Sequence, residues 1–252
     1  MDFGTINIYI CDLRQIGIAK DYPKILNMLD GKAVRRILQY LKEDDRHRML
    51  VREVMLSFLL RMVFGKNEVA IEKNSYGKPT VSLLQNANGY AAPGLPVQDF
   101  DFSISHSGSL VGIAFGRGAM GLDVELIGSA GDFYDLLRFF TKEEQDRVRR
   151  AHDQEREFYR IWTFREAFSK KEGVGLTLFE GREPIHIDYD RNEARFRGNK
   201  AHFFEREHGG HQVALCTENI CTMPEVLMVG REKWKEMILS VKGEKNEGHY
   251  LK

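Results

Sequence analysis

Two carboxylates stand two positions apart inside an apolar run, in the segment GLDVEL (121–126). Side chains alternate between the two faces of a β-strand, so Asp123 and Glu125 would point to one face and the leucines and valine to the other. Ionised carboxylates on one face repel each other unless water or a cation lies between them. A divalent cation such as Mg²⁺ removes the repulsion, because it binds one or two carboxylates together with substrate phosphates. A hydrated strand face without a ligand is the alternative that these residues leave open.

The segment WTFREAFSKKEG (162–173) offers a second group, on a predicted helix. Trp162, Glu166 and Lys170 recur every four residues and therefore share roughly one face of that helix. Glu166 could supply a third metal ligand or act as a general base, and Lys170 could hold a phosphate as a point charge. The alternative is an ordinary Glu–Lys helix pair, which stabilises a helix by roughly 0.2–0.5 kcal/mol.

Further polar and basic residues could bind phosphate. In FSISHSG (102–108), Ser105 and His106 come where a predicted strand ends, and they could donate hydrogen bonds to a ligand or cap the turn that follows. Basic residues gather near the first predicted helix, at the start of the next and in the turn GKP: Lys32, Arg35, Arg36, Arg46, Arg48 and Lys78. Such clusters occur in phosphate sites and also on solvated helix faces.

Several other catalytic patterns are absent or misplaced. GRGAMG (116–121) spells G-x-G-x-x-G, but it leads into a strand instead of opening a helix, so it does not indicate dinucleotide binding. The chain has no G-x-S-x-G elbow and no H-E-x-x-H motif. A triad of Ser105, His106 and Asp123 is disfavoured, because adjacent residues of an extended chain point in opposite directions.

Composition excludes some classes of function. The 252 residues include 37 basic and 37 acidic side chains, so no global field directs the protein to nucleic acid or to a membrane. The three cysteines lack zinc or disulfide spacing, which predicts free thiols in the cytoplasm. We expect no signal peptide, because the second residue is acidic, and no apolar run approaches the length of a membrane span.

The elements that must position these groups mix strands and helices. Alternating patterns predict strands at 6–10, 100–105, 111–116, 121–126, 185–190, 193–197 and 211–217. Helical spacing predicts helices over about 32–64, 155–173 and 234–241, and TKEE (141–144) has the form of a capping box. A loop is predicted over 85–99 and a polar tail over 242–252. The mixture predicts an α/β (α+β) fold with antiparallel pairs.

Together and in this order, the segments resemble the 4′-phosphopantetheinyl transferases, specifically the long, Sfp-type branch. The matching stretches are GKAVRRILQYLKEDDRHRMLVREVML, YGKP, FSISHSG, GLDVE, RFFTKEE and WTFREAFSKKEGVGL. The resemblance implies a pseudo-dimer of two similar α/β halves with largely antiparallel sheets and a coenzyme A cleft between them. We expect an N-terminal, coenzyme A-binding half over 1–116, a metal-binding and catalytic half over 117–232, and a C-terminal helix and tail over 233–252.

The implied reaction moves the 4′-phosphopantetheine group of coenzyme A to a serine hydroxyl of an apo acyl or peptidyl carrier protein and releases adenosine 3′,5′-bisphosphate. By this resemblance, Asp123, Glu125 and Glu166 hold Mg²⁺ against the pyrophosphate. Glu166 or a metal-bound water takes the serine proton, and Lys170 stabilises charge on the pyrophosphate. The implied contacts with coenzyme A are Lys32, Arg36, Arg48, Lys78, Ser105, His106 and Lys170.

Two departures from the family pattern leave alternatives open. Arg165 stands where the family usually has lysine, and an acid role is doubtful for a guanidinium. A coenzyme A or nucleotide-binding module without turnover is therefore one alternative, and a metal-dependent phosphohydrolase with the same carboxylates is another. The loop 85–99 also looks longer than usual. A monomer is expected, since one chain already contains both halves.

Overall fold

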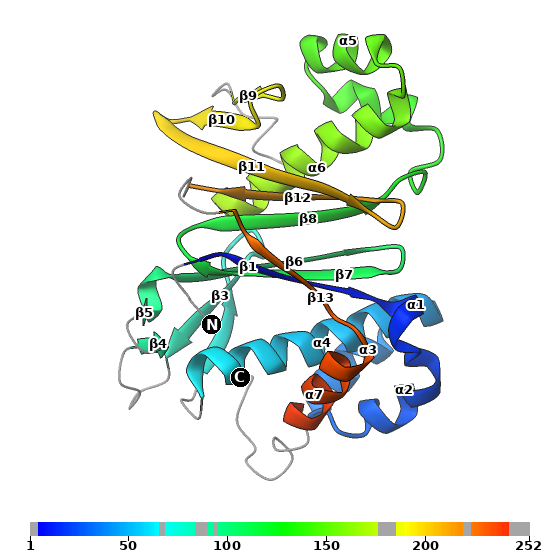
Figure 1. The fold of residues 1–252 in the computed structure, drawn as a ribbon, viewed down its shortest axis with the longest axis vertical. Helices are drawn as coiled ribbons and strands as arrows, with labels where there is room; N and C mark the ends of the chain where they lie inside the picture. Colours follow the sequence, from blue (N-terminus) through cyan, green and yellow to red (C-terminus); the bar gives the residue numbers. More distant parts are fainter. Residues whose placement is uncertain are drawn as a thin grey trace.

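Two largely antiparallel sheets pack face to face, and helices cover the outer face of each (Figure 1). The computed structural model describes residues 5–65, 69–83, 90–92, 95–175, 185–218 and 223–241. The resulting layers are helix, sheet, sheet and helix, so the α+β fold with two halves predicted from the sequence is confirmed.

The N-terminal sheet has four strands, in the order β13 (Glu225–Met228), β1 (Asn7–Asp12), β7 (Leu110–Arg117) and β6 (Phe100–Ser107). Its pairs are antiparallel except β1–β13, which is parallel. The long helix α4 (Glu43–Phe64) covers its outer face (Figure 1). Apolar side chains of α4 are buried against β1, β6 and β7, as the helical spacing of those residues predicts.

The helical region predicted over 32–64 consists of two helices, with a break between the first and the next as expected from the sequence. The first, α3 (Gly31–Leu38), begins where the Asp30 carboxylate accepts hydrogen bonds from two backbone amides, and the chain is extended at Lys42 before α4 begins. Two short helices precede them, α1 (Leu13–Ile16) and α2 (Ile18–Leu26). Neither was predicted, because the left-handed Gly17 between them interrupts the periodicity after only four residues.

The C-terminal sheet has five strands, in the order β8 (Met120–Leu126), β12 (His211–Thr217), β11 (Asn199–His208), β10 (Glu193–Phe196) and β9 (His186–Asp188). The long helix α6 (Gln154–Glu172) packs on its outer face. The strands at 121–126, 185–190, 193–197 and 211–217 are confirmed within a few residues. The strand β11 was not predicted, because six of its ten residues are charged or histidine and mask the alternation.

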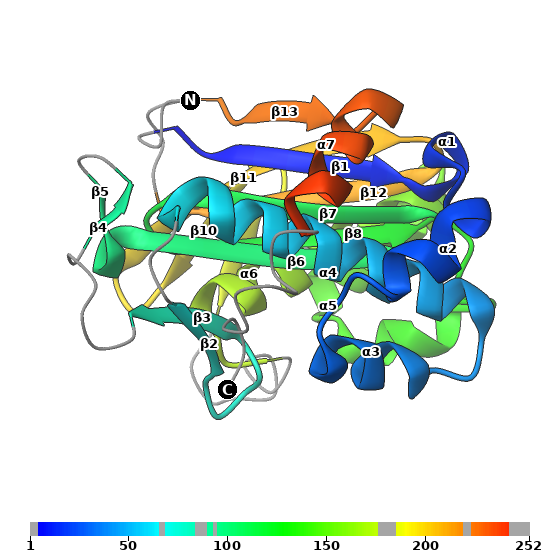
Figure 2. The ribbon, with the colours of Figure 1, turned by 90° about the horizontal axis from the view of Figure 1, so that it is seen from below.

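Between the sheets lies a purely apolar core built from β1, β7, β8 and β12. Leu122 and Val124 are fully buried in it, as the alternation of GLDVEL predicts. The neighbouring carboxylates, Asp123 and Glu125, therefore face the other side of β8. Since β6 and β8 are edge strands of their sheets and lie side by side, these carboxylates stand at the junction of the two halves (Figures 1 and 2).

The last described segment returns to the N-terminal half. Strand β13 pairs with β1, and helix α7 (Arg231–Val241) packs beside α4, as Figure 2 also shows. The boundary predicted near 116 falls between β7 and β8, which belong to different sheets. The C-terminal half, however, contributes no strand after β12 within the described residues. The predicted tail 242–252 lies outside them.

Smaller elements complete the described chain. Two short hairpins flank the N-terminal sheet, formed by β2 (Val69–Lys73) with β3 (Pro79–Leu83) and by β4 (Tyr90–Ala92) with β5 (Leu95–Pro96). They are followed by the 3₁₀ helix η1 (Val97–Asp99), so the described part of the predicted loop 85–99 contains two short strands and a helical turn. The 3₁₀ helix η2 (Phe133–Phe139) precedes α5 (Lys142–Arg150), where the predicted capping box of Thr141 and Glu144 is present. None of the described helices is long and apolar enough to cross a membrane.

Candidate active site

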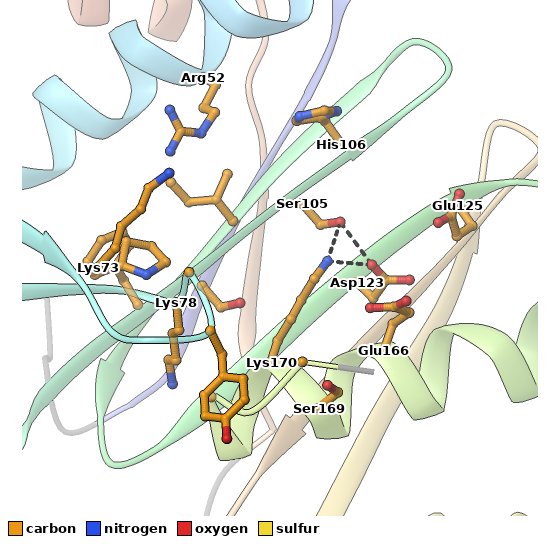
Figure 3. A pocket seen from close by; sticks show the side chains of 18 residues that line it. Arg52, Lys73, Lys78, Ser105, His106, Asp123, Glu125, Glu166, Ser169 and Lys170 are labelled. Carbon is orange, nitrogen blue, oxygen red and sulfur yellow. Dashed lines mark hydrogen bonds and ion pairs between the residues drawn. The ribbon is translucent and has the colours of Figure 1, made fainter. Parts of the chain in front are cut away.

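A pocket of about 490 Å³ opens between the two halves. Strand β6, helix α4 and the β2–β3 hairpin form its wall on the N-terminal side, and β8 and α6 form the opposite wall (Figure 3). The charged and polar side chains in its lining include Arg52, Lys73, Lys78, Ser103, Ser105, His106, Asp123, Glu125, Glu166, Ser169 and Lys170. The predicted residues Asp123, Glu125, Glu166, Lys170, Ser105, His106 and Lys78 thus lie around one cavity.

At the base of the pocket, Lys170, Asp123 and Ser105 form a closed triangle of hydrogen bonds (Figure 3). The Lys170 ammonium donates to Asp123 Oδ1 at 2.6 Å and to Ser105 Oγ at 2.9 Å, and Ser105 Oγ donates to the same Oδ1 at 3.0 Å. Asp123 is only 2% exposed, so the hydrated strand face considered from the sequence does not describe it. An ammonium has three donor hydrogens, and two of them are used here, which leaves one for a ligand.

Serines on every second position of β6 hold β8 in place. Ser103 Oγ accepts the backbone amide of Leu122 at 2.9 Å, and Ser107 Oγ accepts that of Leu126 at 3.0 Å. These amides belong to an edge strand and would otherwise lack a ladder partner on this side. Ser107 Oγ also donates to Glu125 Oε2 at 2.9 Å. The alternation of FSISHS therefore positions both carboxylates of GLDVEL across the junction of the halves.

The negative charges of Asp123, Glu125 and Glu166 repel one another. Burial and then the negative charge of Asp123 raise the pKa of Glu125 to about 7. The same two causes, in the same order, raise the pKa of Glu166. Burial alone would lower the pKa of Lys170, but the attraction of Asp123, Glu166 and Glu125 outweighs it and raises that pKa. One ammonium thus compensates three crowded acidic groups only in part.

One carboxylate oxygen of this cluster has no partner among the described residues. Asp123 Oδ2 is buried and accepts no hydrogen bond from them. A buried carboxylate oxygen without a partner is costly unless a cation or a donor reaches it. Figure 3 shows the carboxylates of Asp123 and Glu166 turned toward each other, with Glu125 farther along β8. No group of three or more histidine, cysteine or acidic residues in the described ranges is preassembled as a metal centre. The all-oxygen donor set nevertheless fits a hard cation completed by phosphate oxygens.

Two cations that were not predicted stand toward the other end of the pocket. The ends of Arg52, on α4, and Lys73, on β2, point toward each other in Figure 3. Arg52 is held by the buried Glu53, whose Oε1 accepts from Nη1 at 2.6 Å. His106 lines the same cavity, where enclosure and then the charges of Arg48 and Arg52 lower its pKa. Arg52 lies one helical turn after Arg48, so helical spacing could have identified it, whereas the short strand with Lys73 has no comparable signal.

Three of the predicted coenzyme A contacts are not in the lining of this pocket. Arg36 pairs with Glu53 at 2.9 Å, and Arg48 donates to the Gly108 carbonyl and pairs with Asp45. Lys32 is exposed in the first turn of α3. Lys78 does line the pocket, but its ammonium is turned away from the cavity (Figure 3).

Arg165 has a structural role. It is 6% exposed and is absent from the pocket lining. Its guanidinium donates to Glu144 Oε2 at 2.6 Å and to the Phe139 carbonyl at 2.8 Å, while Tyr189 donates to the other oxygen of Glu144 at 2.5 Å. Arg165 thereby joins α6 to the capping box of α5. Its departure from the family pattern is therefore no indication of lost catalysis.

We expect Arg165→Met to lower the free energy of unfolding by about 3–5 kcal/mol, because it leaves the buried carboxylate of Glu144 without its cation. Arg165→Lys should be milder, since the charge remains. Chemical denaturation measures both losses. Affinity for ligand, measured well below the unfolding temperature, should change less than about threefold in either variant. A large loss of affinity in a stable Arg165→Lys protein would instead place this side chain at the ligand.

Comparison with protein families gives two matches that follow the two sheets. Residues 17–117 match the family described as 4′-phosphopantetheinyl transferase, N-terminal. Residues 119–216 match the 4′-phosphopantetheinyl transferase superfamily. The junction between the matches falls in the turn from β7 to β8, where the chain passes from one half to the other.

Individual relatives agree with these matches. The chain is 28% identical over 173 residues to the 4′-phosphopantetheinyl transferase Sfp of Bacillus subtilis (strain 168), an overlap of 64% of this chain and 71% of Sfp. It is 28% identical over 145 residues to the 4′-phosphopantetheinyl transferase gsp of Aneurinibacillus migulanus, covering 56% and 54%. It is 27% identical over 167 residues to the mouse L-aminoadipate-semialdehyde dehydrogenase-phosphopantetheinyl transferase, covering 62% and 50%.

Fold and site together define a transferase built of two sheet-and-helix halves, with a pocket of opposite charges between them. The matches extend over both halves and over every motif in the pocket. The chain belongs to the 4′-phosphopantetheinyl transferase superfamily, in its Sfp-type branch. The resemblance stated from the sequence is thereby confirmed.

Proposed function

We propose that this protein transfers the 4′-phosphopantetheine group of coenzyme A to a serine hydroxyl of an apo acyl or peptidyl carrier protein. The observation that carries the proposal is the polarity of the pocket, with an acidic cluster and Lys170 at one end and two cations, Arg52 and Lys73, toward the other. Coenzyme A has a pyrophosphate and a separate 3′-phosphate, so one molecule can meet both ends. The superfamily match supports the same substrate.

In the proposed reaction, the serine oxygen attacks the phosphorus atom on the pantetheine side of the pyrophosphate. A new P–O bond forms as the bond to the bridging oxygen breaks, and adenosine 3′,5′-bisphosphate leaves. Glu166 accepts the serine proton, a role that suits a carboxylate whose pKa is raised. Lys170 donates its remaining hydrogen to a pyrophosphate oxygen and offsets the charge that develops there.

Asp123, Glu125 and Glu166 are the residues that would hold Mg²⁺. When bound, the ion neutralises the pyrophosphate and orients it. The orphan Oδ2 of Asp123 and the raised pKa of Glu125 support this assignment, because both reflect excess negative charge. Ser105 and Ser107 orient the two carboxylates on β8 through the hydrogen bonds described above.

The 3′-phosphate is assigned to Arg52 and Lys73, with His106 nearby. Arg52 keeps a fixed direction because of its pairing with Glu53. Lys73 makes no hydrogen bond or ion pair to any residue in the described part of the chain, so its charge is available to a ligand. This assignment differs from the resemblance, which implies Lys32, Arg36 and Arg48 among the contacts with coenzyme A.

The test is transfer to defined carriers. The protein is incubated with coenzyme A, Mg²⁺ and a panel of purified apo acyl and peptidyl carriers, and the carriers are analysed by mass spectrometry. We expect one carrier serine to gain a phosphopantetheine group, and a carrier whose serine is replaced by alanine to gain nothing. Folded protein that modifies no carrier in the panel would contradict the proposal.

Removal of divalent cations should stop the reaction. With excess EDTA we expect transfer to fall at least about 100-fold, because the acidic cluster and the pyrophosphate then repel each other. Added Mg²⁺ should restore the rate, whereas KCl of equal ionic strength should not. A full rate in excess chelator would exclude a metal at these carboxylates.

We also propose that the active protein is a cytoplasmic monomer. Both halves of the pocket come from one chain, and the described cysteines, Cys11 and Cys216, are buried and unpaired. Size-exclusion chromatography with light scattering at assay concentration tests the oligomeric state.

A further inference from the structure

The Lys78 ammonium is surrounded by acceptors from both halves. It donates to Asp101 Oδ2 at 2.7 Å, to the Met120 carbonyl at 3.1 Å and to the Lys171 carbonyl at 3.3 Å. Its side chain is 13% exposed and that of Asp101 is 17% exposed. All three ammonium hydrogens therefore have protein partners, and no donor remains for a ligand phosphate.

The carbonyl of Lys171 is one of the last of α6, where no amide of the same helix follows. The Asn74 amide, on the same hairpin as Lys78, donates to the Gly173 carbonyl at 2.7 Å. The hairpin thus caps the C-terminus of α6 across the junction of the halves, with a positive charge at the negative end of the helix dipole. Gly173 allows the close approach, because a Cβ there would stand 2.9 Å from Asn74 Nδ2.

Asp101 completes the contact from the other side. Its Oδ2 also accepts the backbone amide of Met120 at 3.0 Å, at the first residue of β8. The pair Lys78–Asp101 therefore connects the β2–β3 hairpin and β6 to the start of β8 and the end of α6. These last two elements carry Asp123, Glu166 and Lys170, while Tyr76, Gly77 and Pro79 of the hairpin line the pocket opposite them.

We propose that Lys78 is a positioning residue and not a phosphate ligand: with Asp101 it forms a latch that sets the distance between the hairpin and α6 and so the width of the coenzyme A pocket. This inference rests on the proposed function for the identity of the ligand. It assigns Lys78 a role through contacts within the protein, in place of the direct contact with coenzyme A that the family resemblance implies.

A latch and a phosphate ligand predict different effects of Asp101. If Lys78 binds phosphate, Asp101 competes for it, so Asp101→Ala leaves affinity for coenzyme A unchanged or improves it. If the two form a latch, removing either partner has the same consequence. Lys78→Met and Asp101→Ala should then each raise the Kd for coenzyme A about tenfold, and the double variant should be no worse than either.

The experiment is calorimetric titration of coenzyme A into the full chain and the three variants, without carrier, well below their unfolding temperatures. Lys200→Met is the matched control, since it breaks a Lys–Glu pair on the far hairpin of β10 and β11. Steady-state rates with a carrier should show a higher KM for coenzyme A, with kcat within about threefold. A role in stability alone would leave both the Kd and the KM unchanged.

Equal, non-additive losses support the latch. Normal or tighter binding by Asp101→Ala beside weak binding by Lys78→Met overturns it, and so do losses that multiply in the double variant. Hydrogen exchange of the backbone amides of Tyr76 and Gly77 gives a second readout that needs no coenzyme A. The exchange should be faster in all three variants than in Lys200→Met. Unchanged exchange also overturns the proposal. A wild-type protein that binds coenzyme A but modifies no carrier would refute the proposed function and leave the latch testable.

Discussion

Asp123→Asn is expected to reduce transfer by about 10²- to 10³-fold while the protein stays folded. The amide can still accept from Lys170 and Ser105, so the triangle at the base of the pocket keeps its shape. It cannot offer a negative Oδ2 to a cation, and that oxygen is buried without a hydrogen-bond partner among the described residues. The free energy of unfolding should change by less than about 2 kcal/mol, because loss of the ion pair with Lys170 is offset by relief from Glu125 and Glu166.

Carrier modification at saturating coenzyme A measures the rate, and calorimetry with Mg²⁺ in the presence of coenzyme A measures cation binding. Both should fall together in Asp123→Asn. Asp44→Asn is the matched control, because Asp44 is an exposed carboxylate in the first turn of α4. A variant that loses the rate but binds Mg²⁺ normally would show that Asp123 acts through Lys170 and not through a metal.

Gly121→Ala, at the first residue of GLDVEL, is expected to destabilise the fold about as strongly as Arg165→Met. A Cβ at this position would stand 2.0 Å from the Ala167 carbonyl oxygen and 2.4 Å from the Lys171 amide nitrogen. Both are backbone atoms of α6, so no side chain can rotate away and the helix must lift from β8. We expect a loss of about 3 kcal/mol or more, which is a fall in Tm of roughly 6–12 °C for a chain of this size.

Thermal and chemical unfolding measure that loss, with Gly230→Ala as control, because a Cβ there meets nothing within 4 Å. Gly121→Ala should also weaken catalysis in the protein that remains folded, since α6 carries Glu166 and Lys170. A stable, fully active Gly121→Ala protein would mean that α6 and β8 are farther apart than described. Glycine is thus required at position 121 because helix and strand approach each other closely there, and not because of its backbone dihedral angles.

The motif residues show how far local sequence reaches. Alternation along GLDVEL and FSISHS correctly predicts which side chains enter the core and which face the junction, because strand geometry depends only on neighbours in the chain. The helical spacing of Glu166 and Lys170 likewise predicts their shared face. The hydrogen bonds from backbone amides of β8 to Ser103 and Ser107 were not predictable. They depend on how two sheets pack against each other, and no backbone ladder joins those sheets.

Arg165 and Lys78 show the complementary lesson. Both are basic residues in motifs with a functional signature: from the sequence, Lys78 was assigned to coenzyme A, and Arg165 raised the question of lost catalysis. The fold directs Arg165 to a buried glutamate and Lys78 to Asp101 and carbonyls of the other half. Residue type determines that each carries a positive charge, whereas the charge's partner depends on which segments the fold brings within hydrogen-bonding distance.

The sequence alone determined the alternating strands, the principal helices, and the acidic and basic residues from which a phosphate site could be built, because these follow from periodicity and residue chemistry within short segments. Tertiary structure decided which of those residues share a cavity, that Arg52 and Lys73 join them, and that β13 returns to pair with β1. Those outcomes depend on contacts between residues that are in some cases more than two hundred positions apart, whose geometry no local pattern specifies.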